Sequence, residues 1–307
     1  MATLEEIITR DDLQEYTADG RAAVNSLFAQ YCKLRDEHSW LVSTAYEQPV
    51  TLPSGEALTL PVIAVHTKTT GPALWILAGI HGEEPAGPNA VAENIALLAN
   101  LAQKNIPIVV FPLCNPSGYR RDWRYPDEYR DFHTGHSIGD SDHLLPRLDQ
   151  PTVPRLPQPS SPDAAAFSAH VHALTKTYPP RIVIDHHEDE SLLPPYIYSQ
   201  GIQGPHDPVA IAIVKLLLAA GMPLEMRGVT RFGEDIVEGV VSSNHDGSID
   251  EFLAAKEIID NGRVVPGPSA STVVAVETPV IDVPLPKRIA AHASIVAAYE
   301  KFWDMVK

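Results

Sequence analysis

The sequence predicts a mixed α/β fold, in which helices cover both faces of a central, mostly parallel sheet. Short apolar runs are typical of buried strands and longer segments with helical spacing are typical of helices, and the two kinds alternate along most of the chain. With 307 residues, of which 44% are hydrophobic, the chain can form one large core. We therefore expect a single domain over residues 1–307, with a helix and edge strands in residues 1–66 and the core in residues 67–307.

The N-terminal part is expected to contribute a helix followed by two antiparallel strands. Apolar residues recur at helical spacing from about Gly20 to Arg35, which indicates an amphipathic helix. Trp40–Ser43 and Leu58–Val65 flank the turn-prone run Pro53–Gly55. This arrangement predicts two strands at one edge of the sheet.

The core is expected to alternate strands and helices. A buried strand that ends at Ile80 leads into a helix, and Pro85 suits the first turn of that helix. The irregular stretch 115–161 interrupts the alternation, and we expect it to be functional because it has aromatic and charged residues rather than low-complexity sequence. The further expected elements are a helix at about Pro85–Leu101, a strand at Ile106–Leu113, a helix at Ser161–Tyr178, a strand at Arg181–Asp185, a helix at Asp207–Ala220, a strand at Thr272–Val276 and a helix at about Pro286–Val306.

The composition limits the partners and the compartment. The net charge of −16 argues against nucleic acids and anionic membranes, because a polyanion would be repelled. Cys32 and Cys114 lack the spacing of a disulfide framework or a thiolate metal site. The first residues lack the features of a signal peptide, and no apolar run has the length of a membrane span. We expect a cytoplasmic protein that binds neither nucleic acid nor membrane and acts on a neutral or cationic small substrate.

Two polar clusters follow apolar runs at the ends of expected strands. His81-Gly82-Glu83-Glu84 comes directly after Ile80, and Asp185-His186-His187-Glu188-Asp189 follows Ile182–Ile184. Ligands of such sheets gather at the carboxyl ends of the strands. Two histidines and one glutamate, with a fourth position open for water, are typical of a catalytic zinc site. The sequence therefore predicts one zinc ion held by His81, Glu84 and His187.

The second cluster contains two adjacent histidines. Neighbouring side chains of a strand point to opposite faces of the sheet, and His187 is the better third ligand of the two. His186 is then expected to pack or to orient a ligand. Asp185 and Glu188 are both plausible hydrogen-bond partners of the ligand imidazoles, which metal sites usually require, and the sequence does not rank them.

Glu277 follows the apolar strand Thr272–Val276 and precedes Thr278-Pro279. A carboxylate at the end of a buried strand can be an ordinary exposed group. Beside a metal it can also act as a general base, which takes a proton from water and passes it to the leaving nitrogen. We predict the second role for Glu277.

These residues and several further segments resemble the M14 zinc carboxypeptidases. The resemblance extends over roughly residues 70 to 280 and keeps the order of the family's motifs. The matching segments are His81-x-x-Glu84, Asn115-Pro116-Ser117-Gly118-Tyr119, Trp123-Arg124, the strand that ends near His187, Gly247-Ser248-Ile249-Asp250 and Val276-Glu277-Thr278.

The resemblance implies a zinc-dependent hydrolase that cleaves an amide or peptide bond in a small peptide or amino-acid amide. It implies that His81, Glu84 and His187 are the metal ligands and that Glu277 is the catalytic carboxylate. Arg124 would match the arginine that stabilises the oxyanion, a contribution of about 3 kcal/mol in the transition state. Arg120, Arg121 and Arg130 compete with it for that role, and Asn115, Arg121 and Ile249 are expected as further substrate contacts.

Two departures from the family's pattern concern the substrate. Where the family usually has an Asn-Arg pair that binds the substrate's terminal carboxylate, the best counterpart here is Asp142-His143. The family's substrate-capping tyrosine has no counterpart, because residues 241–245 contain no aromatic side chain. We therefore expect an atypical anchoring site, in which Asp142 binds a cationic or amidated group and His143 is a polar contact.

Two further functions remain open. The first is hydrolysis of N-acyl amino acids, as in the related branch that includes aspartoacylase and succinylglutamate desuccinylase; a β-rich C-terminal domain would favour it. The second is an inactive metal-binding module that recognises peptide termini. Glu277 argues against the second, since binding alone needs no general base.

Overall fold

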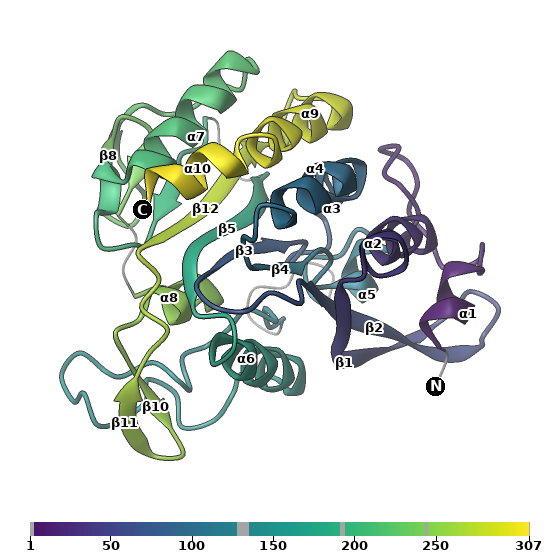
Figure 1. The fold of residues 1–307 in the computed structure, drawn as a ribbon, viewed down its shortest axis with the longest axis horizontal. Coiled ribbons are helices and arrows are strands. Elements are labelled where there is room, and N and C mark those ends of the chain that lie inside the picture. Colours follow the sequence, from purple (N-terminus) through teal and green to yellow (C-terminus); the bar gives the residue numbers. More distant parts are fainter. Residues whose placement is uncertain (1–2, 128–134, 191–193, 243–244, 307) are drawn as a thin grey trace.

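The computed structural model describes residues 3–127, 135–190, 194–242 and 245–306. Within these ranges one sheet of ten strands crosses the molecule (Figure 1). Its strands, in the order in which they lie side by side, are β1 (Leu41–Thr51), β2 (Ala57–His66), β4 (Ile108–Phe111), β3 (Ala73–Ala78), β5 (Pro180–Asp189), β12 (Thr272–Pro279), β6 (Ile197–Ser199), β9 (Val240–Val241), β8 (Asp235–Val237) and β7 (Arg227–Val229).

The centre of the sheet is parallel and its margins are largely antiparallel. The strands β4, β3, β5 and β12 run in one direction. On one side β2 and β1 continue the sheet in antiparallel pairs. On the other side β6 pairs antiparallel with β12. The carboxyl ends of the four central strands therefore lie along one edge, and the expected mixed α/β fold is confirmed.

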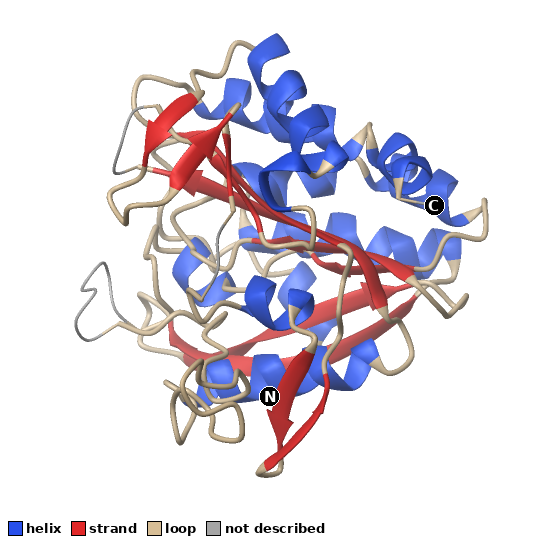
Figure 2. Ribbon diagram, turned by 90° about the vertical axis from the view of Figure 1, so that its left-hand side faces the viewer, coloured by secondary structure: helices blue, strands red, loops and turns tan. Residues whose placement is uncertain are grey.

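Helices pack on both faces of the sheet (Figure 2). One face is covered by α6 (Pro162–Thr175) and α8 (Ile249–Ala254), whose apolar side chains form one core cluster with Trp75 and Val183. A second cluster lies on the opposite face and includes Ile76 and Ile184. Its helices are α2 (Val24–His38), α3 (Ala86–Glu93), α4 (Ile95–Ala102), α7 (Pro208–Ala219), α9 (Leu285–Val296) and α10 (Tyr299–Met305).

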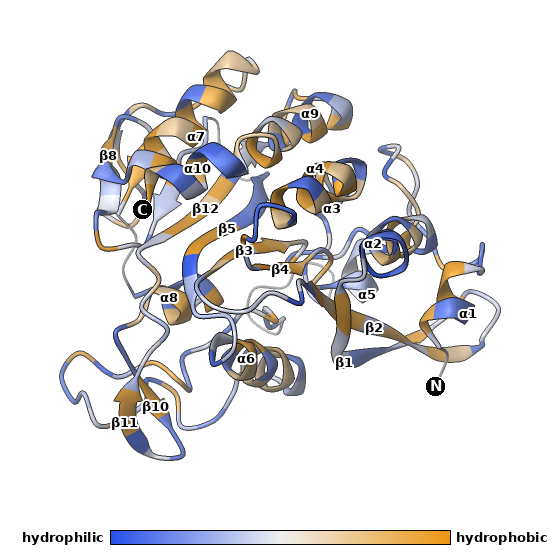
Figure 3. Ribbon diagram, in the orientation of Figure 1, coloured by the Kyte–Doolittle hydropathy of each residue, from blue (hydrophilic) through white to orange (hydrophobic). Residues whose placement is uncertain are grey.

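The central strands are apolar on both sides, as burial under two helical layers requires. Every residue of β3 and of β4 is buried. Figure 3 shows both strands as hydrophobic and the end of β5 as hydrophilic. This polar end contains the cluster Asp185–Asp189, which lies inside a buried part of the fold.

Two expected helices are each divided in the structure. The helix expected at Pro85–Leu101 is interrupted at Asn94, whose side-chain amide donates to the carbonyl of Ala90. The expected C-terminal helix is interrupted between α9 and α10, at residues 297–298.

Several element boundaries also differ from those expected. The strand expected at Ile106–Leu113 is shortened to β4, because Pro107 and Pro112 flank it and cannot donate to the sheet. The strand β5 extends beyond Asp185 to Asp189. The first long helix starts at Val24 rather than Gly20, because the backbone of Ala23, directly before it, is extended.

The remaining described elements are short. They are α1 (Leu4–Ile8), α5 (Pro116–Tyr119), a 3₁₀ turn at Gly204–His206 and the hairpin β10 (Glu257–Asp260) and β11 (Arg263–Pro266). Among the described residues, no helix is both long and apolar enough to span a membrane. Cys32 and Cys114 are buried free thiols. The assignment of residues 1–307 to a single domain stays a prediction.

Candidate active site

The turn His81–Glu84 connects β3 to α3 at the carboxyl edge of the sheet. Gly79 starts the turn with a φ of +66°, which glycine adopts without strain. At Gly82 a Cβ atom would lie 2.2 Å from the carbonyl carbon of Gly118. The turn can therefore pack against the neighbouring loop only with glycine at position 82.

Three side chains converge where this turn meets β5. The carboxylate of Glu84 lies between two imidazoles, with Oε1 2.8 Å from His81 Nδ1 and Oε2 2.8 Å from His187 Nδ1. One ligand atom of each residue lies within 4.8 Å of those of the other two. The structure thus brings the three predicted metal ligands together as a group that could hold a metal ion.

The protonation states of His81 and Glu84 suit a metal site, whereas His187 lies between Asp185 and Glu84, which raise its pKa well above the usual value although burial opposes the shift. Burial lowers the pKa of His81 to about 4, so this imidazole is neutral at pH 7. Burial would raise the pKa of Glu84, but His81 and His187 outweigh it and hold that pKa well below its usual value. A neutral imidazole and an ionised carboxylate are the protonation states in which these side chains bind metals.

Asp185 lies behind His187 on the same face of β5. Its Oδ2 is 3.0 Å from His187 Nε2, and the carboxylate is fully buried. This nitrogen is not the one that faces Glu84, and Asp185 can therefore orient the ring, as carboxylates commonly do for ligand histidines. Burial, with Asp185 beside it, raises the pKa of Asp250 well above its usual value, and a protonated Asp250 can lie next to Asp185 without repulsion.

The side chains of His186 and Glu188 lie on the opposite face of β5, although the backbone N–H of Glu188 donates to Glu84 Oε2 at 3.2 Å. His186 shares a hydrogen bond of 2.8 Å with His292 of α9. Glu188 forms a buried ion pair with Arg288 of the same helix. Of Asp185 and Glu188, which the sequence does not rank, only Asp185 has a described side-chain contact with a predicted ligand imidazole.

A pocket of about 300 Å³ opens beside the group. Its walls include His81, His187, Arg124, Glu277 and Ile249. These side chains come from segments that are far apart in the sequence, and the parallel centre of the sheet brings them together. Ile249, at the start of α8, supplies an apolar part of the wall, as expected of a substrate contact.

Glu277 lies across from His187 in the parallel pair of β12 and β5. It lines the pocket, and burial raises its pKa well above the usual value, although His187 opposes the shift. A carboxyl group with a raised pKa in a pocket is a typical general base or acid. The predicted role of Glu277 is compatible with this position.

Arg124 reaches the pocket from the loop that follows α5. Its Nη1 lies 2.8 Å from Glu83 Oε1 and 3.1 Å from Glu84 Oε1. Arg120, which competes with it for the role of oxyanion donor, is fully buried and donates to the carbonyl of Leu13.

Two more arginines compete with Arg124 for the same role. Arg121 donates to Ser117 Oγ at 2.8 Å and stacks on Trp123. Arg130 lies outside the described residues. Of the described candidates, Arg124 is the one whose guanidinium lines the pocket.

Several predicted substrate contacts lie elsewhere. The described residues that line the pocket do not include Asn115, Arg121, Asp142 or His143. Asn115 is buried, and its side chain accepts from the backbone of Gly118 and donates to the carbonyl of Arg124. In this position Asn115 supports the loop that carries Arg124, and its role as a substrate contact stays a prediction.

Asp142 and His143 also differ from the expectation. Asp142 lies 3.5 Å from Arg155, which provides a positive charge from within the protein. His143 turns toward α6, where its Nε2 is 3.3 Å from Ser168 Oγ. Residue spacing alone could not reveal the partner of Asp142, because Arg155 lies in an irregular loop with no periodic pattern.

The pocket also contains polar residues that were not predicted as site residues. Asp140, Tyr198, Gln200 and Asp246 line it as well. Asp140 is two positions from the predicted Asp142, and Asp246 directly precedes the Gly-Ser-Ile-Asp motif. Tyr198 and Gln200 come from the region of β6, a three-residue strand too short to give a pattern.

Comparisons with known proteins bear on the fold of this chain. No family model matches the sequence, and no curated protein matches it. A provisionally assigned metallopeptidase from Shewanella amazonensis has a similar structure, with a TM-score of 0.67 and 20% identity over 91% of this chain and 92% of that one. Another provisionally assigned metallopeptidase, from Shewanella baltica, has a TM-score of 0.66 and 18% identity over 97% and 100%.

Carboxypeptidase A from Helicoverpa armigera is also similar, with a TM-score of 0.59 and 11% identity over 94% of this chain and 74% of that one. This chain has a zinc carboxypeptidase-like fold. At such identities the likeness shows the fold alone, and the chemistry has to be argued from the side chains in the pocket.

Proposed function

We propose that the chain is a metal-dependent hydrolase that cleaves an amide or peptide bond in a small peptide or amino-acid amide. The observation that carries the proposal is the convergence of His81, Glu84 and His187 within 4.8 Å of one another, beside a pocket that Glu277 lines. Two imidazoles and a carboxylate are the donor set of several zinc hydrolases. Zinc is therefore the metal that we propose.

The residues present fit such an ion. Both histidines direct Nδ1 toward Glu84, and Asp185 lies against the second nitrogen of His187. When bound, the metal would polarise the scissile carbonyl and lower the pKa of a bound water.

Glu277 and Arg124 would provide the remaining chemistry. Glu277 would take a proton from the attacking water and deliver it to the nitrogen of the leaving group, as a general base and then a general acid. Arg124 would donate hydrogen bonds to the oxygen that gains negative charge as the carbonyl is attacked. In the present structure its guanidinium pairs with Glu83 and Glu84, and substrate binding would draw it toward the pocket.

The charge of the pocket favours a substrate without a free carboxylate at the anchoring position. Five carboxyl groups line the pocket, against one guanidinium among its described residues. We propose that Asp140 and Asp246, rather than Asp142, face a cationic or amidated group of the substrate. Asp142 is less suited because Arg155 lies against it.

The deacylase and binding-module functions have less support. Against hydrolysis of N-acyl amino acids, the segments Gly247-Ser248-Ile249-Asp250 and Val276-Glu277-Thr278 resemble the carboxypeptidases more than the deacylases. A module that only binds peptide termini needs no general base, whereas Glu277 lines the pocket with a raised pKa that suits such a base.

A substrate panel tests the proposal. Zinc-loaded protein would be assayed against peptides that differ only at the C-terminus, as free acid or amide, against lysine and norleucine amides, and against N-acyl amino acids. We expect the amides to be cleaved faster than the acids, with lysine preferred over norleucine. Faster cleavage of the free acids would contradict the proposed anchoring, and exclusive cleavage of N-acyl amino acids would establish the deacylase function instead.

A further inference from the structure

A buried arginine from the N-terminal segment lies directly behind the candidate metal site. The side chain of Arg21 is 1% exposed, although the residue precedes α2 in a stretch without regular structure. Its Nη1 donates to the backbone carbonyls of Gly82, at 3.1 Å, and Tyr119, at 2.9 Å. Gly82 lies between the proposed ligands His81 and Glu84, and Arg21 thus holds the ligand turn from its outer side.

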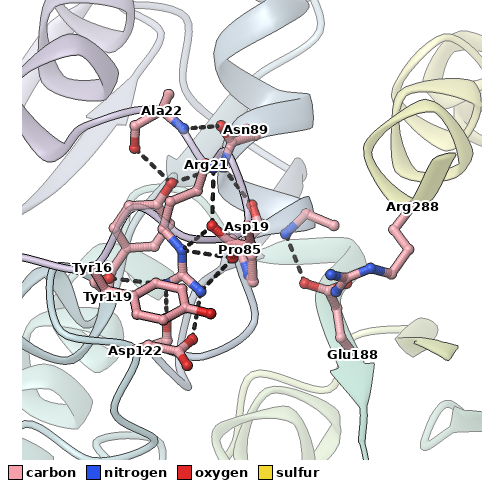
Figure 4. A network of polar contacts seen from close by, with 12 residues as sticks. Tyr16, Asp19, Arg21, Ala22, Pro85, Asn89, Tyr119, Asp122, Glu188 and Arg288 are labelled. Atoms are coloured by element: carbon pink, nitrogen blue, oxygen red, sulfur yellow. Dashed lines mark hydrogen bonds and ion pairs between the residues drawn. The ribbon is translucent and has the colours of Figure 1, made fainter. Parts of the chain in front are cut away.

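The same guanidinium also holds the loop that carries Arg124. Its Nη2 lies 2.5 Å from Asp122 Oδ1 and 2.6 Å from Asp19 Oδ2, and its Nε donates to Asp19 as well. Asp122 is two residues before Arg124 in the sequence. One buried cation therefore connects the ligand turn to the loop of the proposed oxyanion-stabilising arginine (Figure 4).

Aromatic rings fix the plane of the guanidinium. The Cζ atom of Arg21 is 4.8 Å from the ring centroid of Tyr16 and 5.0 Å from that of Tyr119. A lysine at this position would keep the charge but has no planar fork with which to reach both carbonyls and both carboxylates. The geometry thus depends on arginine in particular.

Further polar contacts hold the far end of the ligand turn. The side chain of Asn89 accepts from the backbone of Ala22 and donates to the carbonyl of Pro85, at 3.0 and 2.7 Å. On the opposite side, Glu188 accepts from the backbone of Ala86 at 2.7 Å (Figure 4). The turn is thus held at its middle by Arg21 and at its end by Asn89 and Glu188.

We propose that Arg21 is a positioning residue of the metal site, which holds the His81–Glu84 turn and the Arg124 loop in fixed relation to each other. This inference rests on the proposed function, because it concerns the same site. Without Arg21 the carbonyl of Gly82 loses its donor and the carboxylate of Asp122 loses its cation. The turn can then shift, and the ligands no longer meet in the geometry that binds the metal tightly.

Arg120 provides a matched control. It is as buried as Arg21 and binds the same N-terminal segment, through the carbonyl of Leu13 and the carboxylate of Glu15. Within the described part of the chain, none of its side-chain contacts involves Gly82 or Asp122. If Arg21 only fastens the N-terminal segment to the fold, substitution of Arg120 has the same consequences.

The test compares Arg21→Met, Arg120→Met and Asp122→Asn, each as the full chain. Zinc affinity of the metal-free protein is measured by competition with a chelator, kcat and KM are measured on the best amide substrate, and thermal melts report folding. We expect Arg21→Met to weaken zinc binding 10- to 100-fold, the usual effect of removing a group that supports metal ligands. Arg120→Met lowers the melting temperature but leaves the affinity for zinc within about twofold, far less than that effect.

Asp122→Asn separates the two connections of Arg21. It keeps the contact of Arg21 with Gly82 and weakens the ion pair of Arg21 with the Arg124 loop, and we expect kcat to fall while zinc affinity and KM stay close to those of the wild type. If Arg21→Met does not fold, Arg21→Lys replaces it, with an expected intermediate loss of zinc affinity. Equal zinc affinities of the folded Arg21 variant and Arg120→Met would overturn the inference.

The zinc titration needs no substrate, which separates this inference from the proposed function. A chain that binds zinc tightly but cleaves no amide contradicts the proposed function and leaves the role of Arg21 to be decided by the affinities. A chain that cleaves amides, with an Arg21 variant of unchanged zinc affinity, supports the function and contradicts the role. A wild-type chain that binds no zinc contradicts both.

Discussion

The two faces of β5 show how one strand end serves two purposes. On the pocket face, Asp185 and His187 lie beside Glu84 and form part of a group that could bind a metal. On the back face, His186 and Glu188 contact His292 and Arg288 of α9. The residues of each pair are two positions apart, as the alternation of a strand requires.

Both faces contain buried ionisable groups, but their charges are balanced differently. On the back face His186 hydrogen-bonds His292, and the carboxylate of Glu188 pairs with the guanidinium of Arg288. On the pocket face five carboxyl groups line a cavity with one guanidinium. An excess of buried carboxylates is costly unless a cation or a proton compensates for it. We infer that the pocket face binds ligands, whereas the back face stabilises the fold.

The largest expected difference between the two faces comes from substituting one histidine on each of them. His187→Ala removes one of the three proposed ligands, and we expect it to abolish stoichiometric zinc binding. His186→Leu removes the hydrogen-bond partner of His292 Nδ1 and of the Tyr299 hydroxyl. It should destabilise the fold by about 1–3 kcal/mol but keep one zinc ion per chain. Elemental analysis and chemical unfolding measure the two effects, and equal zinc contents of the two variants would contradict the assignment of faces.

The neighbouring strand β12 offers the next comparison. Glu277→Gln removes the proposed base and should lower kcat by about 10²- to 10⁴-fold, with zinc content unchanged. Thr278, the next residue, faces the back and shares a hydrogen bond with His292. Thr278→Val should cost about 1 kcal/mol of stability and leave kcat within about twofold. Activity that survives in Glu277→Gln would show that another group is the base.

A substitution of Asp185 tests whether this residue orients His187, one of the proposed metal ligands. Asp185→Asn keeps the size of the side chain but weakens its hold on His187 Nε2, and zinc affinity should fall about 10- to 100-fold. The zinc affinity is measured by chelator competition. An unchanged affinity would mean that the 3.0 Å contact with His187 does not orient the ligand.

The smallest expected effect is a dependence of the free energy of unfolding on pH, caused by the buried histidines of the back face. Burial lowers the pKa of His186 to about 4 and that of His292 well below its usual value. Below a pH of about 6.5 the unfolded chain binds protons that the folded chain does not, and the free energy of unfolding decreases as the pH falls. Each histidine contributes about 1 kcal/mol per pH unit.

His292→Gln should therefore reduce the slope of the free energy of unfolding against pH by about 1 kcal/mol per pH unit. This reduction is expected whatever the effect of the substitution on stability at pH 7. Chemical unfolding of metal-free wild type and variant at several pH values between 4.5 and 6.5 measures the slopes. Parallel slopes would show that His292 is not kept neutral by burial.

The sequence predicted the parts of the site in which a local pattern decides the position. A polar residue directly after an apolar strand, such as His81, lies at the carboxyl edge of the sheet wherever the strand pairs. Alternation along a strand separated His187 from His186 before any partner was known. The fold class followed from the same runs.

The rest depended on contacts between distant residues in segments without periodicity. Asp142 was a reasonable anchor by its spacing, but its partner Arg155 follows from the path of an irregular loop. Tyr198 was missed because strands of two or three residues show no alternation. Arg21 was not singled out at all, since nothing in an N-terminal segment indicates that its guanidinium will be buried beside Gly82.

The most direct test of the proposed metal centre is an anomalous diffraction map of zinc-loaded crystals at the zinc absorption edge. We predict one peak per chain, bound by His81, Glu84 and His187 and next to Glu277. A peak at the neighbouring group of Asp185, His187 and Asp250, or no peak beside Glu84 in fully loaded protein, would contradict the proposed centre.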